Sequence, residues 1–512
     1  MLNEVVFNTI ADLYDYIEEY KSTKPNNSAN SLGIIFEEDG HVYWYDSGTS
    51  KVVEVDQDIA FLFYNLANSN LLLDDVMDIV SSRNIDKSAL IAAVNSEDLL
   101  KGFQINSLHC SEFFKHLHKQ IQSGTSQLIL ELTEQCNMRC KYCIYHEGYS
   151  DTRSFGVTSM PKSTALKSID YMVEYGDPEE VYITFYGGEP LLEFELLKDV
   201  IEYCKQKLSN RKLTFSFTSN LTLLTPEMID YFSTVDNLNI MCSLDGPKDI
   251  NDLYRVYADQ SGSFDDTIRN LELLCNACKN NDGFNVSANG VYAPPYSEEK
   301  VKIIDDFFSN LEFVPDNFTY QLGYPSPDTL PEELIDETYA GDLSLQNWQN
   351  EMFSQMKSFN EFKESSIISE YDRIHKRLIT PRTSNNVPLN GCCIAGYRRL
   401  YVKTNGDFTP CERVGYCPTI GNVFTGINLD AIYSKYIFEY SDKWTEHCND
   451  CWSAKLCSRC YVERMDENGV KIPVLETCDY ERSSNIRSLQ KYHHVLLTNP
   501  EKLDFLNSME TI

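Results

Sequence analysis

The amino-acid sequence predicts an α/β fold built around a partial (β/α)6 barrel of the TIM type. Three observations support this prediction. Between residues 127 and 325, apolar runs of strand length alternate with longer helical patterns, which is typical of a parallel sheet with helices outside it. Residues 1–110 show three short strands followed by helices, which predicts a separate α+β domain. Residues 391–480 hold nine of the seventeen cysteines, which predicts a third, cysteine-rich domain.

The composition is that of a globular protein with several domains. At 512 residues the chain is too long for one ordinary core. Its net charge of −33 argues against a nucleic-acid partner, because phosphate binding requires clustered Lys and Arg. No apolar run approaches the ~18 residues of a membrane helix, and the first residues lack a signal-peptide pattern. We therefore expect a soluble, cytoplasmic protein with no membrane partner, whose grouped cysteines bind metal rather than form disulfides.

The N-terminal domain is expected to be a three-stranded meander followed by three helices. The expected strands are 32–36, 42–45 and 51–55, and the expected helices are 58–67, 72–80 and 87–94. This order resembles the winged-helix peptide-recognition element attached to many peptide-maturing enzymes; an unrelated small α+β domain is the alternative. The resemblance implies that the leader of a precursor peptide adds a strand to an exposed edge of this sheet. Residues 111–126 would be a linker to the barrel.

The barrel elements follow from the periodicity of apolar residues. The expected strands are 127–133, 181–185, 213–218, 238–243 and 285–291, and the expected helices are 162–175, 192–209, 225–233, 264–279 and 297–309. Cys204 and Cys242 are expected in the core, and Cys275 and Cys278 on one helix face. A helical bridge, 326–390, and a helical tail, 481–512, flank the cysteine-rich domain. That domain shows little periodicity, so we expect its fold to depend on metal rather than on a large core.

Cys136, Cys140 and Cys143 have the spacing CxxxCxxC directly after the first barrel strand. Three thiolates can bind three irons of a [4Fe-4S] cluster and leave the fourth iron open for chemistry. The loop leaves the end of a strand, where α/β barrels place their active sites. A structural zinc loop with His146 as its fourth ligand is the alternative.

The segment from Glu131 to Cys143 resembles the signature loop of radical S-adenosylmethionine (SAM) enzymes. In that family the open iron chelates the amino and carboxylate groups of SAM, and reductive cleavage gives a 5′-deoxyadenosyl radical that abstracts a substrate hydrogen. The resemblance implies that Cys136, Cys140 and Cys143 are catalytic and that Tyr142 contacts the cofactor. It also implies an electron donor such as flavodoxin or ferredoxin.

Further cofactor contacts are implied where other strands end. After the second strand comes a GGEP segment, which in the family hydrogen-bonds the SAM ammonium: Gly187, Gly188, Glu189 and Pro190. Positions that in the family touch the ribose and methionine parts of SAM match the following residues: Ser219, Asn220, Ser243 and Asp245. Asp245 is equally well explained as a turn residue or helix cap. Arg255 supplies a guanidinium suited to the SAM carboxylate.

The cysteine-rich domain resembles the SPASM extension of radical SAM enzymes that act on peptides and proteins, whose seven cysteines bind two auxiliary [4Fe-4S] clusters. The outer cluster would be bound by Cys448, Cys451, Cys457 and Cys478. The inner cluster would be bound by Cys393, Cys411 and Cys460, with Cys392 or Cys417 as a fourth ligand or with an open iron for a substrate thiolate. Two residues separate Cys457 from Cys460, where the family usually has three. A pair of zinc sites is the alternative.

These resemblances imply a SPASM radical SAM maturase that forms Cys thioether cross-links in a ribosomally synthesised precursor peptide. One alternative is an enzyme like the anaerobic sulfatase maturases, which oxidise a Cys or Ser of a protein, although these usually lack a long segment before the barrel. Maturases that form carbon–carbon links or epimerise residues are a second alternative. A non-catalytic iron–sulfur carrier is a third, and it leaves the GGEP segment and Arg255 unexplained.

Overall fold

The structure is a computed structural model that describes most of the chain. The described residues are 5–24, 31–105, 107–108, 116–121, 123–149, 151–279, 281, 283–326, 329–335, 342–355, 366–379 and 392–508. Within them lie a ten-stranded sheet, a three-stranded sheet and a two-stranded hairpin. Residues 111–115 and 122 of the expected linker, much of the expected bridge and Cys110 lie outside the described residues. None of the helices in the described part is long and apolar enough to cross a membrane.

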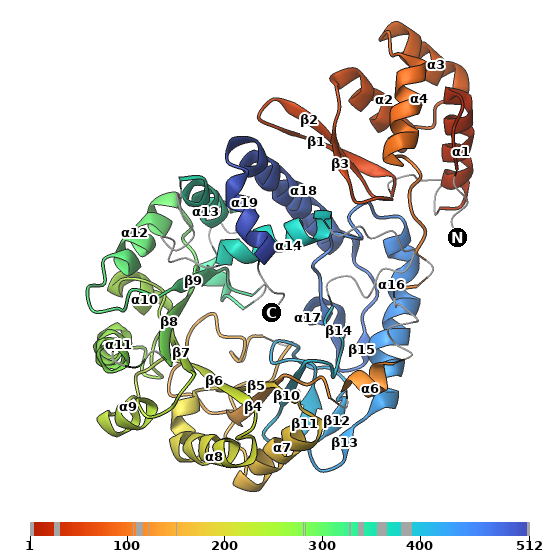
Figure 1. The fold of residues 1–512 in the computed structure, drawn as a ribbon. Helices are drawn as coiled ribbons and strands as arrows, with labels where there is room; N and C mark the ends of the chain where they lie inside the picture. The colour runs from red at the N-terminus through yellow and green to blue at the C-terminus, as the bar shows by residue number, and fades with distance from the viewer. Residues whose placement is uncertain are drawn as a thin grey trace.

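Six parallel strands form an open arc with helices along its outside (Figure 1). The strands are adjacent in chain order: β4 (Gln127–Thr133), β5 (Glu180–Gly187), β6 (Lys212–Ser219), β7 (Leu238–Ser243), β8 (Phe284–Val291) and β9 (Tyr320–Gly323). The helices are α7 (Lys162–Tyr175), η2 (Pro190–Glu193), α8 (Phe194–Lys207), α9 (Pro226–Phe232), α10 (Lys248–Tyr254), α11 (Phe264–Cys278) and α12 (Glu298–Ser309). The predicted α/β fold with a parallel sheet is confirmed. The sequence missed β9 and α10, because four and seven residues are too few to show a period.

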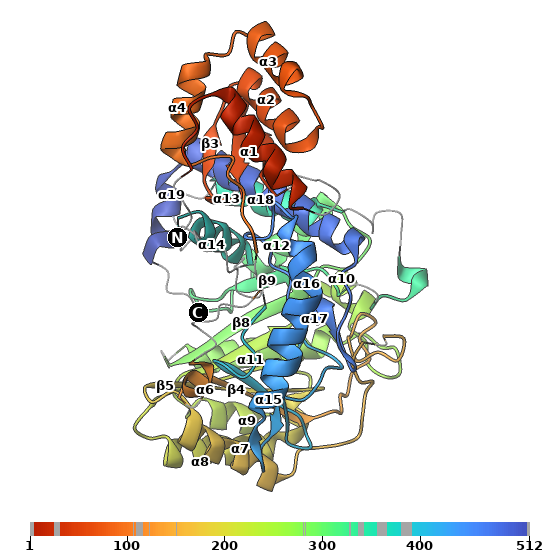
Figure 2. The ribbon, with the colours of Figure 1, turned by 90° about the vertical axis from the view of Figure 1, so that its right-hand side faces the viewer.

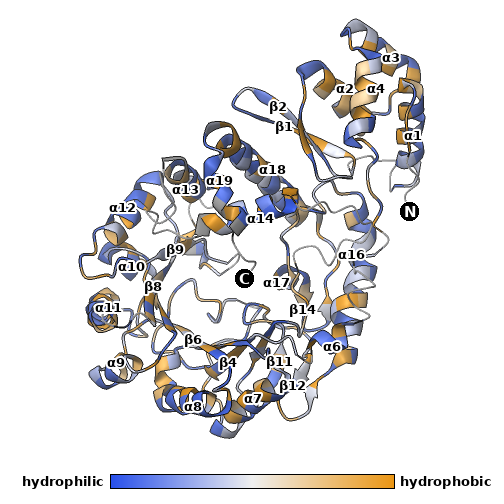
Figure 3. Cartoon of the chain, viewed as in Figure 1, coloured by the Kyte–Doolittle hydropathy of each residue, from blue (hydrophilic) through white to orange (hydrophobic). Residues whose placement is uncertain are grey.

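The barrel core lies between the strands and their outer helices. Along β5, Val181, Ile183 and Phe185 are fully buried and alternate with partly buried residues, as expected for side chains that alternate between two faces. Hydrophilic residues are prominent on the outer helix α8 (Figure 3). Cys204 and Cys242, expected in the core, are buried, and so are Cys275 and Cys278 on α11.

The cysteine-rich region extends the barrel sheet. β10 (Arg399–Val402) pairs in parallel with β4, and three short strands continue from it in antiparallel order: β11 (Asp407–Thr409), β12 (Gly421–Asn422) and β13 (Gly426–Ile427). Leu400, Val402 and Phe408 are buried in the same apolar core as the barrel strands. The expectation that this domain lacks a large core is therefore wrong, because it shares the core of the barrel. The strands were too short to be recognised in the sequence.

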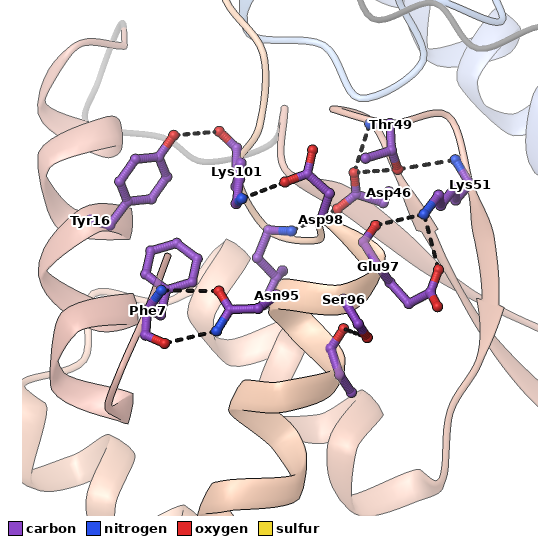
Figure 4. Close-up of polar contacts among 12 residues, drawn as sticks. Phe7, Tyr16, Asp46, Thr49, Lys51, Asn95, Ser96, Glu97, Asp98 and Lys101 are labelled. Atoms are coloured by element: carbon purple, nitrogen blue, oxygen red, sulfur yellow. Dashed lines mark hydrogen bonds and ion pairs between the residues drawn. The ribbon is translucent and has the colours of Figure 1, made fainter. Parts of the chain in front are cut away.

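The N-terminal domain contains the expected meander and three expected helices, preceded by a helix that the sequence analysis missed. Its elements are α1 (Ile10–Ser22), β1 (Gly33–Glu38), β2 (His41–Asp46), β3 (Val52–Glu54), α2 (Gln57–Asn68), α3 (Leu73–Ser82) and α4 (Lys87–Glu97). The missed helix begins with a capping box between Thr9 and Asp12. Figure 4 shows a contact that joins the start of the domain to the end of α4. Asn95 Oδ1 accepts from the backbone N–H of Phe7 at 3.0 Å, and Asn95 Nδ2 donates to the Phe7 carbonyl oxygen at 2.8 Å.

The remaining helices belong neither to the N-terminal domain nor to the barrel. They are α6 (Leu117–Ile121), η3 (Glu332–Leu334), α13 (Ser344–Gln355), α14 (Ser366–Ile379), α15 (Leu429–Ala431), η5 (Ile432–Phe438), α16 (Glu439–Asn449), α17 (Tyr461–Arg464), α18 (Leu475–Thr498), α19 (Glu501–Asp504) and η6 (Phe505–Ser508). The hairpin β14 (Met465–Asp466) and β15 (Gly469–Val470) lies between α17 and α18. In both views the N-terminal domain lies beside α18 and one end of α16 (Figures 1 and 2).

Lys24 ties the N-terminal domain to the end of α16, which carries Cys448. Its Nζ donates to the carbonyl oxygen of Phe103 at 2.9 Å, to the carbonyl oxygen of Asn449 at 2.9 Å and to Asn449 Oδ1 at 3.0 Å. Burial lowers the pKa of this ammonium to about 8, and the charge of Asp450 opposes that shift. Nearby, Ser47 Oγ donates to the carbonyl oxygen of Trp452 at 3.1 Å. The N-terminal domain is thus bonded directly to a segment between two predicted cluster ligands.

We predict that Lys24→Met weakens this contact, because it removes the buried donor to the Asn449 carbonyl oxygen and to Asn449 Oδ1. The free energy of unfolding should fall by about 1–3 kcal/mol, measured by chemical denaturation and by the rate of limited proteolysis. Lys51→Met is the matched control, since the Lys51–Glu97 ion pair is exposed and such pairs contribute ~0–1 kcal/mol. Equal effects of the two substitutions would contradict the prediction.

Candidate active site

The three cysteines of the CxxxCxxC loop line a cavity at the carboxyl ends of the barrel strands. The cavity has a volume of about 220 Å³ and is also lined by residues that follow β5, β6 and β7. Of the residues predicted to contact the cofactor, it is lined by Tyr142, Gly187, Gly188, Glu189, Ser219, Asn220, Ser243 and Arg255. One cavity thus brings together most of the candidate site residues from segments that are far apart in the sequence. Pro190 and Asp245 are buried and are not among the lining residues.

Gly187 and Gly188 allow the cysteine loop to pack against the end of β5. A Cβ on Gly188 would lie 2.0 Å from the carbonyl oxygen of Gln135, and one on Gly187 would lie 2.2 Å from that of Thr133. Gly187 also has a φ of +141°, which favours glycine. The backbone N–H groups of Gly188 and Glu189 donate to the same two carbonyl oxygens, at 2.8 Å each. The glycine pair therefore holds the cysteine loop in place, a role that the sequence analysis did not assign to it.

Glu189 fastens this turn to the end of β6. Its Oε1 accepts from Ser219 Oγ at 2.8 Å and from the backbone N–H of Leu191 at 3.0 Å, and its Oε2 accepts from the backbone N–H of Asn220 at 2.9 Å. Burial raises the pKa of Glu189, and these three bonds oppose that rise. The hydrogen bonds of the Glu189 carboxylate thus join the end of β5 to the end of β6 and position the backbone of both.

Arg255 lies at the cavity wall in contact with the cysteine loop. Its Nη1 donates to the Tyr142 hydroxyl at 2.8 Å and is 3.7 Å from Asp245 Oδ1. The Tyr142 hydroxyl in turn donates to Asp245 Oδ2 at 2.5 Å. Asp245 accepts from the backbone N–H of Val291 at 2.9 Å, so it fixes this network to β8 rather than capping a helix.

The thiols of the loop are held in an environment that disfavours their charged form. Burial, with a contribution from the Glu189 carboxylate and the neighbouring thiols, raises the pKa of Cys136 to about 12. Burial, with a contribution from the Cys140 thiol, raises the pKa of Cys143 to about 11. Burial also raises the pKa of Cys140, and the charge of Arg255 opposes that rise. Thiolates here need a compensating cation, which a bound metal cluster supplies.

Several cavity residues were missed by the sequence analysis. Tyr145 follows Cys143 by two residues, Tyr186 precedes the glycine pair, and Asn289 lies near the end of β8. Asn289 had a detectable signal, because it is a polar residue at the carboxyl end of a strand, like Ser219 and Ser243. The two tyrosines had none, since aromatic residues in such segments usually belong to the core.

The four cysteines predicted to bind the outer cluster are neighbours in the structure. Burial raises the pKa of Cys457 well above its usual range, and the charges of Glu481, Cys448 and Cys451 add to that rise. The charge of Cys478 likewise raises the pKa of Cys451. Two polar side chains contact these sulfurs: Arg464 Nη2 donates to Cys457 Sγ at 3.4 Å, and His447 Nε2 is 3.3 Å from Cys478 Sγ.

A second group contains Cys393, Cys411, Cys460 and Cys392. Burial raises the pKa of Cys392 well above its usual range. The charge of Arg464 opposes this rise, and the charges of Cys460 and Cys393 increase it. Burial likewise raises the pKa of Cys411 to about 12, with a contribution from Cys460. Cys417 instead interacts with Tyr436 and Lys403. The structure therefore favours Cys392 over Cys417 as the fourth member of this group.

The spacing of the sulfurs does not match mononuclear zinc sites. A tetrahedral zinc with Zn–S bonds of ~2.3 Å holds its sulfurs ~3.8 Å apart. Among the described residues, which include all nine cysteines of this region, no three cysteine sulfurs lie within 4.8 Å of one another. Neither group therefore has the sulfur spacing of a tetrahedral zinc site.

Comparison with known proteins identifies the barrel. Residues 130–308 match the Radical SAM superfamily. This chain carries a radical SAM domain. The family resemblance of the cysteine loop is thus confirmed, and the cofactors of this domain are those of its superfamily, a [4Fe-4S] cluster and SAM. The residues present fit both: three thiols and a guanidinium face one cavity, and a cation is needed where the thiols are buried.

Curated relatives of the radical SAM domain include maturases of different kinds. The radical SAM cyclopropyl synthase TigE of Paramaledivibacter caminithermalis is 26% identical over 301 residues, covering 54% of this chain and 62% of that protein. A cysteine-type anaerobic sulfatase-maturating enzyme of Clostridium novyi is 24% identical over 294 residues, covering 56% of this chain and 73% of that protein. An uncharacterized protein of Methanocaldococcus jannaschii is 30% identical over 151 residues, covering 30% and 49%. The chain spans less than two thirds of the length of the first and third of these relatives.

A solved structure supports the fold beyond the barrel. Native anSMEcpe with bound AdoMet and Cp18Cys peptide superposes with a TM-score of 0.55 and 18% identity, covering 75% of this chain and 100% of that chain. At this identity the similarity concerns the fold alone.

We predict that Gly188→Ala displaces the cysteine loop, because its Cβ would overlap the Gln135 carbonyl oxygen. The variant should bind about four fewer irons per chain than wild type after anaerobic reconstitution, measured by iron and sulfide analysis. Gly323→Ala is the control, since nothing lies within 4 Å of a Cβ there. Unchanged iron content in Gly188→Ala would contradict the role assigned to the glycine pair.

Proposed function

We propose that this chain is a radical SAM maturase that modifies a ribosomally synthesised precursor peptide and forms Cys thioether cross-links. The observation that carries the proposal is the cavity in which Cys136, Cys140, Cys143 and Arg255 meet at the strand ends. A simple iron–sulfur carrier would not need the cation or the glycine turn there. The same chain carries two further cysteine groups and a separate N-terminal domain, which suits a large substrate.

Each part of the cavity has a role in this proposal. The three cysteines would hold the cluster through three irons, and Arg255 would bind the SAM carboxylate. The loop of Gly187, Gly188, Glu189 and Pro190 would present backbone oxygens to the SAM ammonium. When bound, the cluster and SAM together supply the radical that abstracts a substrate hydrogen. The burial of the cavity wall would keep water away from that radical.

The cysteine-rich region would be a SPASM domain with two auxiliary [4Fe-4S] clusters. Cys448, Cys451, Cys457 and Cys478 would bind the outer cluster, and Cys392, Cys393, Cys411 and Cys460 the inner one. Bound there, the clusters would supply a route for the electron left after the C–S bond forms, and an electron donor such as flavodoxin or ferredoxin would supply the electron that SAM cleavage consumes. The shared sheet supports this arrangement, because β10 pairs directly with β4, the strand that leads into the cysteine loop.

The N-terminal domain would be a winged-helix-like recognition element for the leader of the precursor peptide. Its sheet has the order β1-β2-β3, and within the described residues no strand pairs with the outer edge of β3. The opposite edge is covered, because α18 packs against β1 and Gln490 Nε2 donates to the Glu37 carbonyl oxygen at 2.9 Å. A leader could therefore add as a strand at β3, with main-chain hydrogen bonds providing affinity.

A second candidate function is oxidation of a Cys or Ser in a protein, as the name of the Clostridium novyi relative describes for that enzyme. The match over 73% of that relative supports it. The N-terminal domain favours the peptide substrate, because leader recognition would give that domain a function.

We predict that wild-type protein reconstituted without oxygen binds about twelve irons per chain. The variant Cys136→Ala/Cys140→Ala/Cys143→Ala should retain about eight and lose SAM cleavage. Iron and sulfide analysis and chromatography of 5′-deoxyadenosine measure the two results. A wild-type count near four, with zinc present, would remove the auxiliary clusters from the account while leaving the SAM site.

We predict that a Cys-containing precursor peptide with its leader is converted, in the presence of SAM and a reductant, to a product that has lost one hydrogen from carbon and one from sulfur. Mass spectrometry with thiol alkylation detects this, since a thioether sulfur no longer reacts. Removal of the leader should slow the reaction. A carbonyl-containing product with loss of the sulfur would support the sulfatase-maturase function instead.

A further inference from the structure

The Tyr142 hydroxyl is placed between the two charged groups at the cavity wall. It donates to Asp245 Oδ2 at 2.5 Å and accepts from Arg255 Nη1 at 2.8 Å, whereas Arg255 Nη1 and Asp245 Oδ1 are 3.7 Å apart. The guanidinium therefore contacts the carboxylate chiefly through this hydroxyl. A phenylalanine would fill the same space without joining them.

Asp245 and Arg255, the two partners of the hydroxyl, are each fixed by further hydrogen bonds. Asp245 is 1% exposed and receives the Val291 N–H, which fixes its carboxylate to the end of β8. The backbone of Arg255 is bonded on both sides: its N–H donates to the Asn251 carbonyl oxygen at 2.8 Å, and its carbonyl oxygen accepts from Ser263 Oγ at 2.9 Å. What remains adjustable is the long Arg255 side chain, and Tyr142 restrains it.

The position of this side chain matters because it carries the positive charge of the cavity. Among the described residues that line the cavity, Arg255 is the only cationic one. The carboxylate in the wall, Glu189, already accepts three hydrogen bonds. A ligand carboxylate entering the cavity therefore has one strong partner, and a guanidinium binds it well only when its donors point along the right directions.

We propose that Tyr142 is a positioning residue, whose hydroxyl, anchored by Asp245, orients Arg255 toward the carboxylate of the amino-acid part of SAM. This inference rests on the proposed function and adds a determinant of cofactor affinity to it. The aromatic ring packs 5.7 Å from that of Tyr254 between ring centroids and belongs to a small apolar cluster. The ring thus packs the cysteine loop in place, whereas the hydroxyl is the group that hydrogen-bonds Arg255.

Tyr142→Phe separates these two roles, because it keeps the ring and removes the hydroxyl. The control is Tyr257→Phe, a tyrosine in the same segment as Arg255 whose hydroxyl bonds Asp266 at 2.8 Å instead. Both variants and wild type are reconstituted without oxygen, and equilibrium dialysis measures their affinity for two ligands. One is SAM, and the other is 5′-methylthioadenosine, which keeps the adenosine and sulfur but lacks the carboxylate.

In Tyr142→Phe we expect the Kd for SAM to rise about tenfold, with no change for 5′-methylthioadenosine and no loss of iron. Tyr257→Phe should match wild type with both ligands. An unchanged Kd for SAM, or an equal loss for both ligands, would overturn the role of the hydroxyl while leaving the SAM site in place. If wild type binds no SAM, the proposed function fails, and this inference with it.

A second variant keeps the test decisive if Tyr142→Phe loses iron. Asp245→Asn lies outside the cysteine loop and removes the charge that anchors the hydroxyl. It should weaken SAM binding and leave 5′-methylthioadenosine binding unchanged. Equal affinity for SAM in Asp245→Asn and wild type would overturn the inference.

Discussion

The site depends on the close contact between the cysteine loop and the turn that follows β5. Two backbone hydrogen bonds and two missing Cβ atoms allow the loop to lie against Gly187 and Gly188, and Glu189 then ties the same turn to β6. Three strand ends are thereby held as one unit. This contact fixes the backbone that brings the cysteines and Ser219 to one cavity.

A second constraint joins the outer parts of the molecule to that unit. β10 extends the barrel sheet from β4, so the cysteine-rich region shares the apolar core of the barrel. Lys24 in turn binds Asn449, next to Cys448. Contacts among the described residues thus link the N-terminal domain to the outer cysteine group, and a shared apolar core links the cysteine-rich region to the barrel. These links suit the proposed function, in which the N-terminal domain would hold the leader of a peptide whose core reacts at the cavity.

The sequence predicted the features that have a long period or a recognisable spacing. The parallel sheet, most of its helices and the CxxxCxxC loop follow from patterns of apolar residues and cysteines. It could not predict β10 to β13, which are two to four residues long and pair only through the tertiary fold. Nor could it reveal that Asp245 supports Tyr142, because that contact joins residues 103 positions apart.

Electron paramagnetic resonance of the reduced, reconstituted protein tests the central claim most directly. If the cluster held by Cys136, Cys140 and Cys143 has an open iron in this cavity, adding SAM should change the g values of one cluster signal and leave the others unchanged. The change should disappear in the triple cysteine variant, which retains the auxiliary signals. A spectrum that SAM does not alter, from protein with its full iron content, would contradict the account.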